Sequence, residues 1–278
     1  MTDLPLAGVI GWPIHHSRSP RLHGFWLRRH GIAGAYLPMA VAPDRLEAAL
    51  RGLAALGFRG VNVTVPHKET ALALADSADG VARRIGAANL LTVDAEGRLH
   101  ATNTDAFGFA ANLKAACPSF RAEDGPAVVL GAGGAARAVL ASLLDDGSPE
   151  IRLANRSPER ALALAEAFDA GRVRPVAWDE REAAMDGAAL LVNTTSLGMQ
   201  GQPPLAMRLD ALPLQAVVAD IVYVPLETGL LAAARARGHV TVDGLGMLLW
   251  QAQPAFRTFF GIAPEVDQAL RDAVLGEG

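Results

Sequence analysis

The chain has 278 residues, of which 51% are hydrophobic and 19% are charged, and its formal net charge is −4 at pH 7. This length suits two domains of roughly 140 residues each, and the composition excludes a disordered or collagen-like chain. A mildly acidic chain with scattered charges is not expected to bind nucleic acid. The single cysteine, Cys117, allows no internal disulfide, which suits a reducing compartment. Without a signal-peptide pattern or a run of about 18 apolar residues, we expect a cytoplasmic protein that does not enter a membrane.

In the first 116 residues, short apolar runs alternate with longer amphipathic stretches, which predicts strands and helices in turn. Strands are expected at residues 6–10, 35–41, 61–65, 90–93 and 99–101. Helices are expected at residues 20–30, 43–57, from 67 onward, and at 104–116. Ser19 is the expected N-cap of the first helix, because Pro20 suits the first helical position. The segment 94–97 predicts a hairpin turn between the last two strands.

The pattern restarts after residues 114–125, which predict a boundary between two domains. Strands are expected at residues 127–130, 151–154, 173–176, 190–192, 216–221 and 239–242. Helices are expected at residues 133–144, 158–168, 226–237, 245–260 and 264–274. Strands that alternate with helices predict right-handed crossovers and a parallel sheet.

A glycine-rich segment joins the first strand and helix of this second half. Gly131, Gly133, Gly134 and Ala135 lie in the string GAGGAA, which matches G-x-G-x-x-G/A. The first glycine allows a tight turn, and the second lets the backbone approach a pyrophosphate at the helix N-terminus. This context predicts dinucleotide binding. A methyltransferase, which uses a similar loop, is the more distant alternative.

The end of the next strand favours NADP over NAD. An NAD-binding fold of this kind usually places an acidic residue there for the ribose hydroxyls. This chain instead has Asn155, Arg156 and Ser157, with Arg160 four residues after Arg156. Two guanidinium groups suit a 2′-phosphate. The alternative is that both arginines are simply solvated.

Polar residues gather at the predicted strand ends and loops of the N-terminal half. They are Ser17, Ser19, Asn62, Thr64, Lys68, Asn89, Asn103 and Asp105, joined by Gln251 from the far end of the chain. Neutral hydroxyls and amides can define the hydroxyl positions of a small polyol acid, and carbonyl reduction needs a proton donor. Lys68 is the candidate donor, and Asp105 is placed to orient its ammonium group. Each residue taken alone also has a purely structural explanation.

Together these segments resemble the shikimate dehydrogenase family. The matching segments, in family order, are 14–20, 60–69, 103–105, the loop at 131, 155–157, 193–199, and 243–248 with Gln251. The string Asn-Val-Thr-Val-Pro-x-Lys at 62–68 is the most specific of them. Two positions depart from the family pattern, because Leu90 stands where threonine is usual and Ala106 where glycine is common.

The resemblance implies a reversible, NADPH-dependent reduction of 3-dehydroshikimate to shikimate in aromatic amino-acid biosynthesis. It implies that Lys68 and Asp105 form the catalytic pair. The implied substrate residues are Ser17, Ser19 and Tyr223 for the carboxylate, and Thr64, Asn89, Asp105 and Gln251 for the ring, with Asn62 close by. The implied cofactor residues are Gly131, Gly133, Gly134, Ala135, Asn155, Arg156, Ser157, Arg160, Thr194, Gly244 and Met247.

We therefore expect an α/β protein of two domains. Residues 1–105 and 241–278 are expected to form a discontinuous substrate domain, and residues 106–240 a Rossmann-like NADP-binding domain with a parallel sheet. No spacing of histidines or cysteines indicates a metal site. The alternatives are a quinate/shikimate dehydrogenase that uses NAD and a non-catalytic NADP-binding sensor. The sequence leaves open whether the protein is a monomer or a homodimer.

Overall fold

The computed structural model describes residues 4–276, and the chain divides into two compact units. The first unit contains the chain up to Asp105 and the segment from Leu248 onward, and the second contains Ala106–Met247. The chain thus returns from the second unit to the first after Met247, inside helix α9 (Gly244–Phe260). The return was expected after residue 240. No helix within the described residues is long and apolar enough to cross a membrane.

The first unit is built on a six-stranded mixed sheet with the strand order β2-β1-β3-β5-β6-β4. Its strands are β1 (Leu6–Gly11), β2 (Ala35–Ala40), β3 (Phe58–Val63), β4 (Ser77–Ala78), β5 (Leu90–Val93) and β6 (Leu99–Thr102). The first three are parallel to one another, and the expected hairpin forms the antiparallel pair β5–β6. Its helices, besides most of α9, are α1 (Ser19–Arg29), α2 (Leu46–Gly52), α3 (Lys68–Leu74), α4 (Gly80–Ile85) and α10 (Gln268–Leu275).

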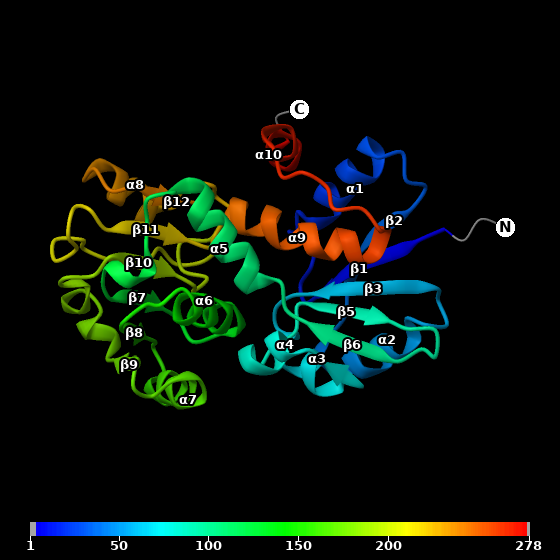
Figure 1. Ribbon diagram of the computed structural model, residues 1–278, viewed down its shortest axis with the longest axis horizontal. Helices are drawn as coiled ribbons and strands as arrows, with labels where there is room; N and C mark the ends of the chain where they lie inside the picture. The colour runs from blue at the N-terminus through cyan, green and yellow to red at the C-terminus, as the bar shows by residue number, and fades with distance from the viewer. Residues whose placement is uncertain (1–3, 277–278) are drawn as a thin grey trace. The chain divides into compact units, whose positions relative to one another are not determined.

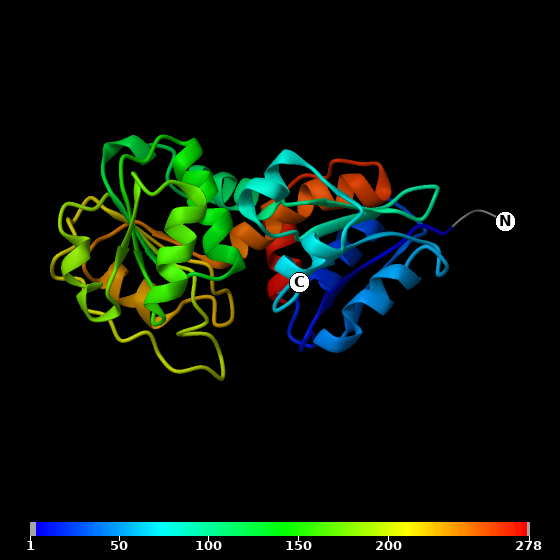
Figure 2. The ribbon, with the colours of Figure 1, turned by 90° about the horizontal axis from the view of Figure 1, so that it is seen from below.

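Helices cover both faces of this sheet (Figure 1). On one face, α1 and α9 enclose the buried aromatic side chains Trp26, Phe256 and Phe259. The last helix, α10, lies beside the first, α1 (Figures 1 and 2), and Arg29 Nη1 pairs with Asp267 Oδ2 at 2.6 Å. The C-terminal segment therefore completes a core that the N-terminal segment begins.

The second unit is built on a six-stranded, fully parallel sheet with the order β12-β11-β10-β7-β8-β9. Its strands are β7 (Ala127–Leu130), β8 (Ile151–Ala154), β9 (Val173–Val176), β10 (Leu190–Asn193), β11 (Val217–Asp220) and β12 (Thr241–Val242). Its helices are α5 (Asp105–Ala116), which begins at the boundary, α6 (Gly134–Asp145), α7 (Pro158–Phe168) and α8 (Gly229–Ala236). The order reverses between β7 and β10, and sheets of this kind bind ligands beyond the carboxyl ends of the strands at that point.

Strand β7 shows why its sequence is apolar throughout. Val129 packs in one core with Leu140 of α6, and its neighbour Val128 packs in another with Leu231 of α8. Successive side chains of a strand point to opposite faces, so a strand with helices on both sides buries every residue. The parallel sheet expected from the alternation of strands and helices is confirmed.

The third strand differs from its predicted limits. The alternation over residues 61–65 predicted a half-buried strand, but β3 spans Phe58–Val63, and Thr64 and Val65 lie beyond its end. The strand lies inside the sheet and buries every residue except Arg59. Asn62 is therefore a buried polar residue and does not indicate that one face of the strand is exposed to solvent.

Several helix ends also differ from prediction. The helix expected over residues 43–57 is a 3₁₀ turn followed by α2, which ends at Gly52. Ser19 is not the N-cap of α1, because Arg18 takes that position and Ser19 is the first helical residue. Helix α8 begins only at Gly229, since Thr228 caps it by accepting a hydrogen bond from the Leu231 amide.

Two short elements, β4 and α4, were not predicted. Asp79 Oδ1 caps α4 by accepting a hydrogen bond of 2.7 Å from the Ala82 amide. Gly86 ends the helix at φ +71°, a conformation that glycine adopts without strain. The aspartate and the glycine flanking residues 80–85 were the signals that could have located this helix.

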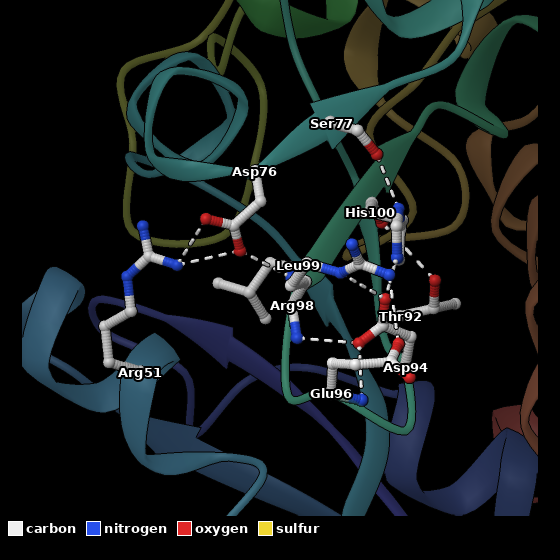
Figure 3. Close-up of polar contacts among 9 residues, drawn as sticks. All are labelled: Arg51, Asp76, Ser77, Thr92, Asp94, Glu96, Arg98, Leu99 and His100. Carbon is white, nitrogen blue, oxygen red and sulfur yellow. Dashed lines mark hydrogen bonds and ion pairs between the residues drawn. The ribbon is translucent and has the colours of Figure 1, made fainter.

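A polar network fastens β4 to β6 at the edge of the first sheet (Figure 3). Ser77 Oγ lies 2.5 Å from His100 Nδ1, and His100 Nε2 lies 2.8 Å from Asp94 Oδ2. Nearby, Asp76 accepts hydrogen bonds from Arg51 and from the Leu99 amide. The order of serine, histidine and aspartate resembles a hydrolytic triad, but the histidine presents Nδ1 to the serine, opposite to the usual arrangement. We interpret the network as a structural connection of the edge strand.

Candidate active site

An ion pair in the first unit joins the starts of two helices. Lys68 is the first residue of α3, and Asp105 is the first residue of α5. Lys68 Nζ lies 2.5 Å from Asp105 Oδ2, and the two side chains are 15% and 7% exposed. A nearly buried pair of this kind fixes the ammonium group in one place, because neither charge is easily left without the other. These two residues were expected from the sequence to act together, and the structure brings them into contact.

Asn89 connects this pair to the C-terminal segment. Its Nδ2 donates a hydrogen bond of 2.9 Å to Asp105 Oδ1 and lies 3.3 Å from Gln251 Oε1. Its Oδ1 accepts a hydrogen bond of 2.8 Å from the Thr104 amide. Asn89, Asp105 and Gln251 were all predicted site residues, and they form one buried cluster. Thr104 was not predicted, although it lies inside the Asn-Thr-Asp segment that was used for the resemblance.

Backbone contacts hold this cluster in position. The Asp105 amide donates to Asn103 Oδ1 at 2.9 Å, and Asn103 Nδ2 donates to the Ala87 carbonyl at 2.9 Å. The Ala88 amide in turn donates to the Lys68 carbonyl at 2.8 Å. Asn103 thus orients the backbone of the catalytic candidates rather than projecting away from the fold.

Tyr36 contacts Asn62, and His23 stacks on Tyr36; neither was predicted as a site residue. Tyr36 Oη donates a hydrogen bond of 2.8 Å to Asn62 Oδ1, and Asn62 Nδ2 donates to the Asn89 carbonyl at 3.1 Å. Burial raises the pKa of Tyr36, while a hydrogen bond with the Ser19 side chain acts in the opposite direction. The ring of His23 stacks on Tyr36 at 3.8 Å, and burial lowers the pKa of His23 to about 3, so this imidazole is neutral.

Ser17 lies in the loop between β1 and α1, Ser19 begins α1, and Thr64 directly follows β3. The Ser19 amide donates to Ser17 Oγ at 3.4 Å, and both serines precede or begin α1. The Thr64 amide donates to the Ile10 carbonyl at 2.9 Å, which places Thr64 beside the end of β1. Because the ends of parallel strands meet at one edge, hydroxyl groups from two loops share the edge where α3 begins.

The glycine loop of the second unit leaves room for a phosphate. Gly131 has φ +106°, and a Cβ added there would lie 2.8 Å from Thr194 Oγ1, so only glycine fits. A Cβ added at Gly133 would meet nothing within 4 Å, which leaves open space at the start of α6. Backbone amides at a helix N-terminus beside open space fit the pyrophosphate of a dinucleotide. Gly134 and Ala135 follow as the first residues of α6.

The segment after β8 carries the two arginines. Arg156 and Arg160 are exposed, so both guanidinium groups are free to meet a phosphate. Asn155 Nδ2 donates to the Ser157 carbonyl at 2.9 Å, and Ser157 Oγ donates to Glu159 Oε2 at 2.8 Å. These contacts shape the turn that carries the two arginines. The N–H donors of the arginine side chains suit a 2′-phosphate.

The remaining predicted cofactor residues lie at the start of α9. A Cβ added at Gly244 would lie 2.2 Å from the Ile221 carbonyl oxygen, so the helix begins directly against the loop after β11. Met247 is 8% exposed and belongs to the core of the second unit. Tyr223 is half-buried in the loop after β11. It belongs to the second unit, whereas the two serines with which it was grouped belong to the first.

Family models match most of both units. The shikimate dehydrogenase substrate binding domain matches residues 9–91, and shikimate / quinate 5-dehydrogenase matches residues 114–199. The shikimate dehydrogenase (NADP(+)) of Rhodospirillum rubrum is 63% identical over 275 residues, which cover 98% of this chain and 97% of that protein. The chain belongs to the shikimate dehydrogenase family. The predicted family is confirmed.

Solved structures of family members share the fold. Shikimate 5-dehydrogenase from Thermus thermophilus, in complex with NADP(H) and shikimate, is 39% identical with a TM-score of 0.87, over 98% of this chain and 99% of that one. Quinate dehydrogenase from Corynebacterium glutamicum, in complex with NAD, is 33% identical with a TM-score of 0.90, over 99% and 100%. The same fold therefore occurs in a family member bound to NADP(H) and shikimate and in one bound to NAD.

Proposed function

We propose that this protein catalyses the reversible reduction of 3-dehydroshikimate to shikimate with NADPH, a step of aromatic amino-acid biosynthesis. The observation that carries the proposal is the buried Lys68–Asp105 pair, which Asn89 holds from the other side of the carboxylate. It occurs in a chain that is 63% identical to a shikimate dehydrogenase (NADP(+)) over nearly its whole length. The first unit binds the substrate, and the second unit binds NADP(H).

The reaction adds a hydride to the carbonyl carbon and a proton to its oxygen. NADPH supplies the hydride when it is bound and becomes NADP⁺. The protein's part is to place the carbonyl group and to deliver the proton. Lys68 Nζ donates that proton to the developing alkoxide, and Asp105 keeps the amine oriented after the transfer. In the oxidation of shikimate these roles reverse, and Lys68 Nζ accepts the hydroxyl proton.

The neutral polar residues hold the substrate in register with Lys68. Ser17 and Ser19 bind the carboxylate, and the family resemblance also assigns Tyr223 to the substrate. Asn62, Thr64, Asn89, Asp105 and Gln251 bind the ring hydroxyls and the carbonyl group. Their support is the shared edge of the first sheet and the cluster that joins Asn89, Asp105 and Gln251.

The cofactor residues lie at the carboxyl edge of the second sheet. The pyrophosphate binds at the glycine loop formed by Gly131, Gly133, Gly134 and Ala135. Arg156 and Arg160 bind the 2′-phosphate, and Asn155 and Ser157 form the turn below it. Gly244 and Met247 complete the site for the nicotinamide end, and Thr194 supports the glycine loop.

NAD-dependent oxidation of quinate is the second candidate, because the fold of a quinate dehydrogenase bound to NAD covers 99% of this chain. Steady-state assays of shikimate and quinate, each with NADP⁺ and NAD⁺, separate the candidates. We expect shikimate with NADP⁺ to have the highest kcat/KM of the four combinations. A higher kcat/KM for quinate with NAD⁺ would reject the proposal, and NADP⁺ binding without any turnover would indicate a sensor.

We also propose a cytoplasmic location and action as a monomer or a homodimer. Cys117 is a free, buried thiol, which suits a reducing compartment. Size-exclusion chromatography with light scattering distinguishes the two oligomeric states.

A further inference from the structure

A buried polar network lies in the second unit where β10 and β11 end. Asn193 is the last residue of β10, Asp220 is the last residue of β11, and the two are paired in register. Asn193, Asp220 and Thr228 are 0%, 2% and 1% exposed. Polar groups buried so completely destabilise the fold unless each has a hydrogen-bond partner. The network does not belong to the residues that the proposed mechanism uses.

The carboxylate of Asp220 accepts three hydrogen bonds. Oδ1 accepts from Asn193 Nδ2 at 2.9 Å and from the Val222 amide at 3.0 Å. Oδ2 accepts from Thr228 Oγ1 at 2.7 Å. All three partners are donors, so an ionised carboxylate satisfies them together. A protonated carboxyl group would direct its own O–H toward a donor, and at least one of the three bonds would be lost or reversed.

On one side, the network orders the loop that follows β10. Asn193 Nδ2 also donates to the Leu197 carbonyl at 3.1 Å, and Asn193 Oδ1 accepts from the Thr195 amide at 3.0 Å. Thr194 lies between these contacts, and its Oγ1 is the atom that a Cβ on Gly131 would strike. The side chain that Asp220 holds therefore orders the turn around Thr194, whose own amide and hydroxyl donate to the Leu130 carbonyl beside the glycine loop.

On the other side, the network orders the loop that follows β11. Its bond with the Val222 amide fixes the backbone between Asp220 and Tyr223. Gly244 lies directly against the Ile221 carbonyl in this loop. Asp220 thus sits at the junction of three segments that the proposed function assigns to the cofactor: the loop after β10, the loop after β11 and the start of α9.

Burial makes the ionised form of Asp220 costly. It raises the pKa of Asp220 to about 6, although the hydrogen bonds from Val222, Thr228 and Asn193 act in the opposite direction. The ionisable groups on the neighbouring elements are Tyr223, Glu227, Arg235, Arg237, His239 and Asp243. Arg237 pairs with Asp210 at the surface. Glu227 pairs with Arg235 at the surface, and Asp243 accepts from the Leu245 amide. His239 Nδ1 faces the Ala216 carbonyl, which precedes β11 and lies at the opposite end from Asp220.

We propose that Asp220 is a positioning residue for the cofactor: its ionised carboxylate holds the loops after β10 and β11 in the arrangement that binds NADP(H). The inference rests on the proposed function, because it takes these loops as part of the NADP(H) site. It goes further by assigning a role to a carboxylate that takes no part in hydride or proton transfer. It also predicts that cofactor affinity depends on the protonation of a group buried in the second unit.

The test measures NADP⁺ binding by calorimetry for the wild-type protein and for Asp220→Asn, at several pH values between 5 and 8. Asparagine has nearly the shape of aspartate but cannot ionise, so it imitates the protonated state. We expect the variant to bind NADP⁺ about tenfold more weakly at pH 8, the loss typical of one hydrogen bond to a charged group. The ratio of the two dissociation constants should fall toward one at pH 5, where the wild-type carboxyl group is itself protonated.

The ratio is the decisive quantity, because the 2′-phosphate of NADP⁺ also titrates near pH 6 and affects both proteins equally. The matched control is Asp186→Asn, which removes an exposed carboxylate of the same unit and should match wild type at every pH. A purely structural role for Asp220 would give a ratio that does not change with pH. That result, or a ratio near one at pH 8, would overturn the inference while leaving the proposed function intact.

Two further outcomes are decisive. A wild-type protein that fails to bind NADP⁺ would refute the proposed function and this inference with it. If Asp220→Asn did not fold, Thr228→Val would serve instead, because it removes the donor to Oδ2. We expect that variant to shift the fall in NADP⁺ affinity to higher pH, and an unshifted profile would contradict the proposal.

Discussion

The buried carboxyl group of Asp220 should make the wild-type protein less stable at neutral pH than its other interactions alone would make it. Its pKa rises from 3.8 to about 6 in the folded state, because burial disfavours the ionised form. Between these two values the folded protein holds a proton that the unfolded chain has lost. The free energy of unfolding therefore decreases as the pH rises through this window.

The size of the effect follows from the shift. Each pKa unit corresponds to about 1.36 kcal/mol, so a shift of about two units lowers stability by about 3 kcal/mol between pH 3 and pH 8. Roughly half of this, about 1.4 kcal/mol, falls between pH 5 and pH 8, where the protein is easiest to study. Asp220→Asn lacks this contribution, so its stability relative to wild type should increase by that amount over the same range.

The assay is urea unfolding of both proteins at pH 5, 6, 7 and 8 in the absence of NADP⁺. The difference between the two unfolding free energies cancels every other titrating group that the substitution leaves unchanged. A difference that stays constant with pH, or one that decreases toward pH 8, would refute the reasoning. Combined with weaker NADP⁺ binding by the variant, the expected result would show that this carboxylate supports function at the expense of stability.

The remaining predictions concern the site directly. Lys68→Met should lower kcat about 10²–10⁴-fold with little change in the dissociation constant of NADP⁺. Steady-state kinetics and calorimetry measure the two quantities. A variant with wild-type turnover would exclude Lys68 as the proton donor. Arg156→Ala should weaken NADP⁺ binding about 10–100-fold but leave NAD⁺ binding nearly unchanged. As a control, Arg174→Ala, which removes another exposed arginine, should change the binding of neither cofactor. Equal losses for both cofactors in Arg156→Ala would argue against a 2′-phosphate contact. Gly131→Ala should lower stability by about 1–3 kcal/mol even without cofactor, because its φ is +106°. Gly133→Ala should leave the melting temperature unchanged and weaken NADP⁺ binding, and a reversed pattern would contradict the assignment of the loop.

Local rules were sufficient where short segments decide their own conformation. The glycine loop, the parallel sheet of the second unit and the hairpin of residues 90–101 follow from turn chemistry and periodicity, and all three are present. The errors lie where burial is not visible in a short window. The strand expected at residues 61–65 spans Phe58–Val63, because the alternation around Asn62 belongs to a strand that is buried on both faces and does not mark its limits.

Tertiary contacts decided what surrounds the candidate catalytic residues. Tyr36 and His23 belong to different elements from Asn62, and their stacking and hydrogen bond give no sequence pattern. The same is true of Asp220, which looks like an ordinary acidic residue at the end of a strand. Only the structure shows that it is buried and accepts three hydrogen bonds.

The sequence by itself therefore determined the family, the glycine loop, the arginines after β8 and the identity of Lys68 and Asp105 as a pair. These depend on residue types at fixed spacing, which a linear chain records directly. The tertiary structure decided that Asn89 joins Asp105 to Gln251, and that Asp220 connects three loops of the second unit. Such contacts depend on which distant segments fold against one another and exclude water, and that information exists only once the chain is packed.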